Sequence, residues 1–66
     1  MGQAEDISRI VSVLVRAGSL GLTSGELSLR LDIPLERLEP SLGRAIDSGD
    51  VYVRHDVGGP PRYVAV

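Results

Sequence analysis

The stretch that decides the fold is residues 22–34, which read LTSGELSLRLDIP. Thr23 stands three residues before Glu26, which is the spacing of a helix capping box. In this motif the threonine hydroxyl accepts a hydrogen bond from the glutamate amide, and the glutamate carboxylate accepts one from the threonine amide. The spacing therefore predicts that a helix begins at about residue 24.

The sequence also predicts where this helix ends. Leu27 and Leu31 are four residues apart and share one helical face, while Leu29 is an additional apolar residue. Pro34 disfavours the helical conformation of the residue before it. We therefore expect a short helix over 24–31 and a tight turn after it. Leu22, just before the capping box, is a candidate for a short strand.

A longer helix is predicted before this stretch, over about residues 5–17. Gly18 follows the last periodic residue and is a natural helix stop. The β-branched content of the segment also permits a strand, but two full turns of helical periodicity favour the helix. The predicted buried face consists of Ile7, Ile10, Val11 and Leu14.

A third helix is predicted over about residues 35–48, with Gly49 as its stop. Pro40 conflicts with this assignment, because proline lacks an amide hydrogen and clashes with the preceding turn. Either the helix kinks there, or 35–38 is a separate turn and Pro40 is the first residue of the main helix. The predicted inner face consists of Leu35, Leu38, Leu42, Ala45 and Ile46.

The C-terminal segment is predicted to be a β-hairpin. Residues 51–54 and 62–66 alternate with a period of two, and two glycines and two prolines lie in the loop between them. We expect Val53 to face Val64 and Val51 to face Val66, which would give an inner face of four valines.

Composition limits the classes of function. The 66 residues suffice for one domain, residues 1–66, and contain no cysteine and one histidine. We therefore expect no metal site, no cofactor and no enzymatic activity. The formal net charge is −2, and the sequence has no apolar run long enough for a membrane span. No signal peptide is expected at the N-terminus, so the expected compartment is the cytoplasm.

The order of these elements resembles a winged helix-turn-helix DNA-binding domain of the kind found in small bacterial, phage and plasmid regulators. This resemblance implies an α+β fold in which three helices precede a two-stranded β-hairpin wing. It covers about residues 6–66. The residues that carry it are Leu22 to Leu27, Leu31 to Pro34, Leu42 to Val51, and Arg54 to Tyr63.

The resemblance implies that the third helix enters the DNA major groove and that the wing touches the DNA backbone. A helical wheel places Arg37, Ser41 and Arg44 on the outer side of the third helix, where arginines reach base edges or phosphates. The candidate phosphate contacts are Arg54, His55 and Arg62 at the wing and Arg30 at the end of the second helix.

Two functions are therefore open. The first is sequence-specific binding of double-stranded DNA by a small transcriptional regulator, dimeric through Val13 and Val15 of the first helix. The alternative is an acidic winged helix that binds a protein partner and no DNA. The arginines favour DNA binding, whereas the negative net charge and Pro40 favour the alternative.

Overall fold

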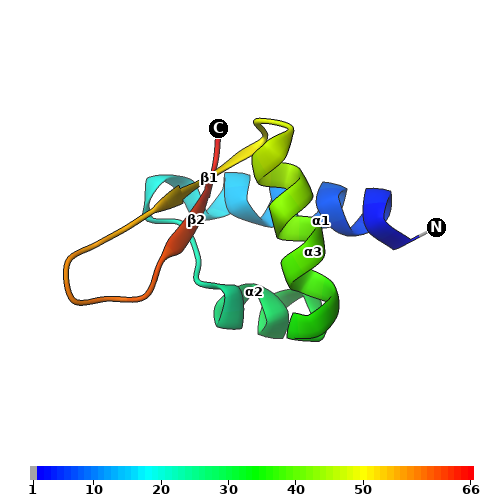
Figure 1. Cartoon of the computed structure of the whole chain (residues 1–66), viewed down its shortest axis with the longest axis horizontal. Coiled ribbons are helices and arrows are strands. Elements are labelled where there is room, and N and C mark those ends of the chain that lie inside the picture. Colours follow the sequence, from blue (N-terminus) through cyan, green and yellow to red (C-terminus); the bar gives the residue numbers. More distant parts are fainter. Residues whose placement is uncertain (1) are drawn as a thin grey trace.

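Three helices and one hairpin follow one another along the chain in a computed structural model, which describes the backbone of residues 2–66 and the side chains of 5–66. In Figure 1 α3 crosses in front of α1, α2 lies below them, and the hairpin projects to one side. This is the predicted α+β layout, and it is consistent with a winged helix. The elements are α1 (Gly2–Ala17), the 3₁₀ turn η1 (Gly18–Leu20), α2 (Ser24–Leu31), α3 (Leu35–Asp47), β1 (Val51–Arg54) and β2 (Arg62–Ala65).

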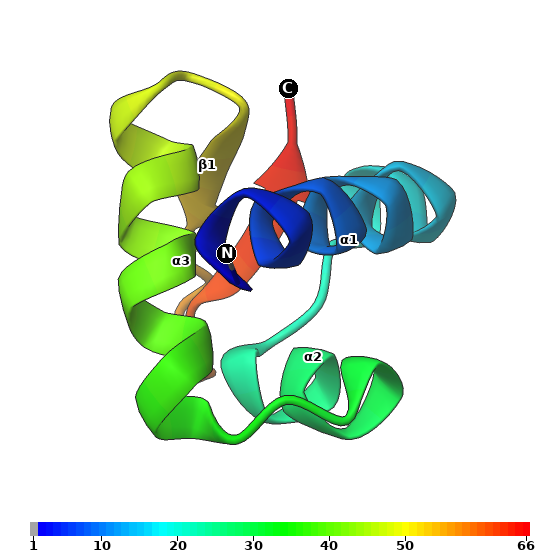
Figure 2. The same ribbon diagram turned by 90° about the vertical axis from the view of Figure 1, so that its right-hand side faces the viewer.

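Most predicted boundaries agree with these bounds. The differences are that α1 begins three residues before the predicted position 5, α3 ends one residue early, and β2 ends at Ala65 rather than at residue 66. Figure 2 shows α1 obliquely from its N-terminal end, with α3 standing upright beside that end and α2 below. The three helices thus enclose a common core.

The capping box at the start of α2 is confirmed. The Thr23 amide donates to Glu26 Oε1 at 2.9 Å, and the Glu26 amide donates to Thr23 Oγ1 at 3.2 Å. At the other end Asp32 adopts a left-handed conformation with φ of 55°. The Ser28 hydroxyl then donates to the Ile33 carbonyl at 2.6 Å, which holds the tight turn before α3.

Helix α3 runs without a break through Pro40, so the interpretation of 35–38 as a separate turn is wrong. Pro34 is the N-cap of this helix, and its carbonyl accepts from the amides of Arg37 and Leu38 at 3.0 and 2.9 Å. Pro40 cannot donate to the carbonyl of Glu36, four residues earlier. Glu36 and Pro40 are both exposed, so water can satisfy that carbonyl.

Gly49 is the stop of α3, as predicted. Gly49 has a φ of +84°, and its amide donates to the carbonyl of Ile46 at 3.0 Å. The amide of Asp50 donates to the carbonyl of Ala45, also at 3.0 Å. Together these two bonds form a Schellman motif, which reverses the chain into β1.

The three α-helices and the hairpin all contribute side chains to the core. Four predicted core positions differ. Ile7, Val11 and Ile46 are half-buried and pack against the core, and Leu35, in the first turn of α3, is 45% exposed. Leu29, the additional apolar residue of α2, is 85% exposed. The buried cluster comprises Ile10, Leu14, Leu22, Leu27, Leu31, Ile33, Leu38, Leu42, Ala45 and Val51.

The predicted hairpin register is wrong by one residue. Val53 pairs with Tyr63 rather than with Val64, and Val51 pairs with Ala65. Since a one-residue slip moves side chains to the opposite face of a strand, Val64 lies on the other face from Val51. Both valines are nevertheless buried, at 3% and 2% exposure.

A short bridge explains why Val64 is buried. Leu22 pairs with Tyr63 in an isolated antiparallel bridge, through N–H···O bonds of 3.0 and 2.8 Å, as the expected short strand would. Gly21 precedes this bridge with a φ of +68°, and a Cβ there would lie 2.8 Å from Cγ2 of Val64. The close approach of the 21–22 segment to β2 therefore requires glycine.

We expect Gly21→Ala to destabilise the fold by roughly 3 kcal/mol or more, because the added methyl group collides with β2 and the backbone conformation is unfavourable. Gly18→Ala is a matched control: its φ is +71°, but no atom lies within 4 Å of the added Cβ. The control should lose only about 1 kcal/mol. Urea denaturation measures both, and equal losses would show that the close approach contributes nothing.

Thr23→Ala should lower the free energy of unfolding by about 1 kcal/mol, because it removes the hydroxyl that caps α2. For a domain of this size the melting temperature would fall by about 4–8 °C. Ser24→Ala is the control, since Ser24 occupies the first turn of the same helix outside the capping box. An unchanged melting temperature for Thr23→Ala would contradict the energetic role of the box.

Candidate nucleic-acid interface

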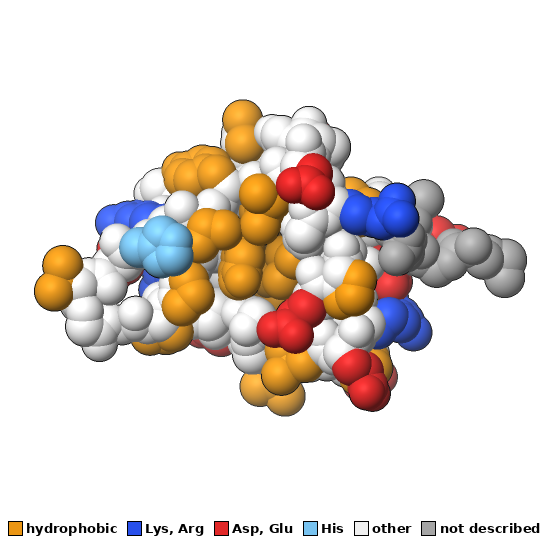
Figure 3. Space-filling view, viewed as in Figure 1, with side chains coloured by type: hydrophobic (Ala, Val, Ile, Leu, Met, Phe, Trp, Pro, Cys, Tyr) orange, Lys and Arg blue, Asp and Glu red, His pale blue; other side chains and the backbone are white. Residues whose placement is uncertain are grey.

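The exposed stripe of α3 is acidic. Glu36, Glu39 and Asp47 are all exposed, together with Pro40 and Gly43. In Figure 3 acidic side chains lie along α3, whereas basic side chains lie at its margin, towards the N-terminal half of α1. The surface that a DNA-reading helix would turn towards the major groove thus carries carboxylates.

Ser41 does not lie on this surface. It was predicted to point outward, but it is fully buried, and its hydroxyl lies 3.4 Å from the carbonyl of Arg37. Its position explains the error, because Ser41 is three residues after Leu38 and four before Ala45, both of which belong to the core. Ser41 is therefore part of the packing of α3 and is not available for contact with DNA.

Arg37 is engaged in a bidentate ion pair with Asp6 of α1. Its Nε and Nη2 atoms lie 3.0 and 3.2 Å from the two carboxylate oxygens. Asp6 is 3% exposed, whereas the Arg37 side chain remains 55% exposed. A buried carboxylate needs such a partner, so this arginine ties α3 to α1.

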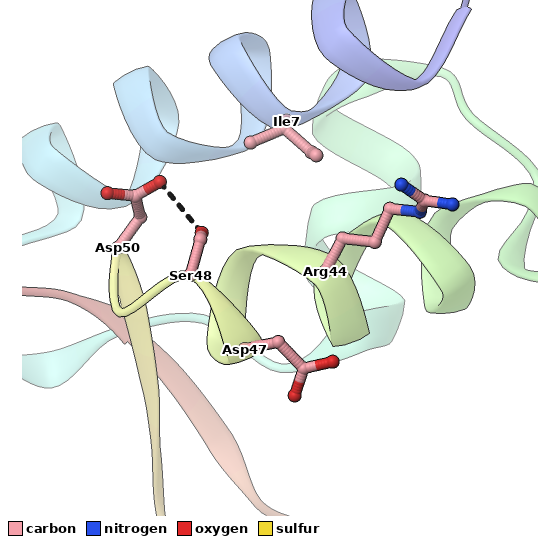
Figure 4. A pocket seen from close by; sticks show the side chains of 5 residues that line it. All are labelled: Ile7, Arg44, Asp47, Ser48 and Asp50. Atoms are coloured by element: carbon pink, nitrogen blue, oxygen red, sulfur yellow. Dashed lines mark hydrogen bonds between the residues drawn. The ribbon is translucent and has the colours of Figure 1, made fainter.

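Arg44 lies on the same margin of α3, two turns further along. Figure 4 shows it at a shallow pocket beside Ile7 of α1, while the Asp47 carboxylate points away from both. Ser48 and Asp50 complete this pocket and are joined by a hydrogen bond of 3.0 Å. Arg44 is exposed and forms no salt bridge with any side chain of residues 5–66.

Arg54 links the wing to the body of the domain. Its Nη1 atom donates to the carbonyl of Ser19 at 2.9 Å, and its Nε atom lies 3.4 Å from Oδ1 of Asp56. The side chain is 46% exposed. His55, its neighbour, is exposed at the start of the wing loop.

Arg62 and Arg30 lie near the capping box instead of near α3. Arg62 Nη1 is 3.4 Å from the carbonyl of Gly21 and 3.8 Å from Glu26 Oε1. The hydrogen bond from the Thr23 amide, with help from Arg62 and Arg30, lowers the pKa of Glu26 below its usual value. These two arginines therefore surround an ionised carboxylate on α2.

The two valines predicted to form a dimer contact differ in their surroundings. Val13 is half-buried and packs against the core, whereas Val15 is 63% exposed. Val15 lines a shallow pocket of about 300 Å³ with Tyr52 and Val66, which are 48% and 82% exposed. Dimer formation through α1 stays a prediction.

The sequence did not lead us to predict some residues that hold the helices together or lie beside the candidate site. Asp6 precedes Ile10 and Leu14 at spacings of four and eight, which was a signal that it shares their buried stripe. Arg9 donates to the carbonyl of Leu31 at 2.7 Å and joins α1 to the end of α2. Arg16 stands seven residues after Arg9, so the two lie on one stripe of α1.

Comparisons with models of protein families, with curated proteins and with solved structures found no match. Within the described part of the chain, no three acidic or histidine side chains are grouped so that they would hold a metal ion. None of the helices described there has both the length and the apolar content needed to cross a membrane.

Arg37→Ala should destabilise the domain by about 1–2 kcal/mol, because it leaves the buried Asp6 carboxylate without its charged donors. The exposure of Arg37 keeps this loss below that of a fully buried pair. Arg44→Ala, on the same stripe, should change the stability by less than about 0.5 kcal/mol. Thermal denaturation of both variants measures the difference. If the two variants are equally stable, Arg37 has no structural role and is free for binding.

Proposed function

We propose that this chain is a protein-interaction module that binds its partner through the exposed face of α2 and α3. The observation that carries the proposal is the acidic outer stripe of α3, formed by Glu36, Glu39 and Asp47. DNA binding gains affinity from cations that replace the counterions of phosphates. Carboxylates on the surface nearest the DNA would oppose such binding.

The exposed sides of α2 and α3 also offer apolar anchors. Leu29 is 85% exposed on α2, Leu35 is 45% exposed at the start of α3, and Pro40 is exposed in its middle. Exposed apolar side chains surrounded by charged ones are typical of interaction sites. The complementary partner is a protein segment with apolar side chains and lysine or arginine residues.

Binding of double-stranded DNA by a small transcriptional regulator is the second candidate. It is supported by the wing, where Arg54 and His55 are exposed at the start of the loop, and by Arg30 on α2. In this case the DNA phosphates would contact the wing, and Arg44 would be the residue of α3 that contacts the bases. The expected compartment for either function is the cytoplasm.

An amphipathic helical peptide of leucine and lysine tests the proposal, with binding followed by shifts of backbone amide resonances. We expect the peptide to shift amides of α3, including those of Glu36, Glu39 and Gly43. Glu36→Gln combined with Glu39→Gln should weaken binding roughly three- to tenfold through the loss of two ion pairs. Asp56→Asn, which removes an exposed acid from the wing, is the matched control and should leave the affinity unchanged.

A duplex DNA of mixed sequence at about 50 mM salt separates the two candidates. For the interaction module we expect affinity weaker than about 100 µM, below the usual range of non-specific binding. Tighter DNA binding that shifts α3 amides would contradict the proposal. So would a peptide that shifts other surfaces, or one that binds the double glutamine variant as well as the parent.

A further inference from the structure

A groove of about 610 Å³ lies between the C-terminal half of α1, α2 and the start of β2. Three arginines line it, and each comes from a different element: Arg16 from α1, Arg30 from α2 and Arg62 from β2. The three arginines are therefore not close together simply because they are neighbours on one helix. The fold brings together three guanidinium groups that are far apart in sequence.

The balance of charge in this groove is positive. Glu26 is the one carboxylate among its lining residues, so the formal charge there is +3 − 1 = +2. The carboxylate already accepts from the Thr23 amide at 2.9 Å and lies 3.8 Å from Arg62. The groove is thus cationic in a chain whose net charge is −2.

Its hydrogen-bond donors are largely free. Among the side chains described for residues 5–66, neither Arg16 nor Arg30 forms a hydrogen bond or a salt bridge. A guanidinium group offers five donors in a planar fork that matches a carboxylate or a phosphate. The groove therefore has unused capacity to bind an oxyanion.

The rest of the lining is apolar. Val13 and Ala17 of α1, half-buried, and the exposed Leu20 of η1 stand beside the arginines. A volume of about 610 Å³ falls in the range of small-molecule sites, which combine apolar walls with a few polar groups. This combination suits a ligand that has both an anionic and an apolar part.

We propose that this groove binds a small organic anion, in which a phosphate or carboxylate pairs with Arg16, Arg30 and Arg62 and an apolar body contacts Val13 and Leu20. The site shares no residue with the acidic stripe of α3. It therefore stands whether or not α3 binds a protein partner.

Three probes dissect the proposal by amide shifts of the full chain: phenyl phosphate, inorganic phosphate and benzyl alcohol. We expect saturable binding to be tightest for phenyl phosphate, which has both parts, with shifts at Val13, Ala17 and Arg62. Arg30→Gln should weaken this binding roughly tenfold, as expected for the loss of charge-assisted hydrogen bonds. Arg44→Gln removes an exposed arginine outside the groove and is the matched control.

A capped tripeptide, leucine-glutamate-leucine, distinguishes a free metabolite from the acidic side chain of a protein as the source of the anion. Tighter binding of phenyl phosphate than of the tripeptide supports the small molecule. Tripeptide binding without phenyl phosphate binding would overturn the proposal, as would equal weakening by Arg30→Gln and Arg44→Gln. Shifts that never saturate, or benzyl alcohol binding as tightly as phenyl phosphate, would also overturn it.

Discussion

The contact between Gly21–Leu22 and β2 is the constraint on which the rest of this structure depends. Two backbone hydrogen bonds join Leu22 to Tyr63, and the missing side chain of Gly21 lets the two segments approach. This contact anchors a hairpin that is otherwise a short two-stranded ribbon, which would be marginal by itself. It also buries Val64 and places Arg62, the next residue before Tyr63, beside the start of α2.

Sequence was sufficient where the structure follows local rules. The capping box at Thr23 and the stop at Gly49 were predicted correctly because both depend on residues within one turn of each other. The hairpin register was predicted wrongly, because the loop over residues 55–61 is too long for turn geometry to fix the pairing of the strands. Pro40 was ambiguous for a similar reason: helix continuity depended on the tertiary packing of the residues around it.

The errors at the candidate site have one physical source. The seven-residue spacing of Arg37 and Arg44 correctly places them on one stripe, but periodicity does not say which neighbour that stripe faces. The stripe faces α1, so Arg37 pairs with Asp6, while Ser41 is buried between the core positions Leu38 and Ala45. The acidic outer stripe follows from the same rotation of the helix.

Net charge is a poor guide to what this chain binds, because the fold separates its charges. The net charge of −2 is a sum over surfaces of opposite sign. These include the acidic outer stripe of α3 and a groove of charge +2, which is lined by residues of α1, α2 and β2. At physiological salt the field of each surface fades over about 8 Å, so a ligand responds to the surface that it touches and not to the sum. In the part of the chain described, the surfaces that we propose for a cationic and an anionic ligand are therefore separate. An acidic total excludes neither class.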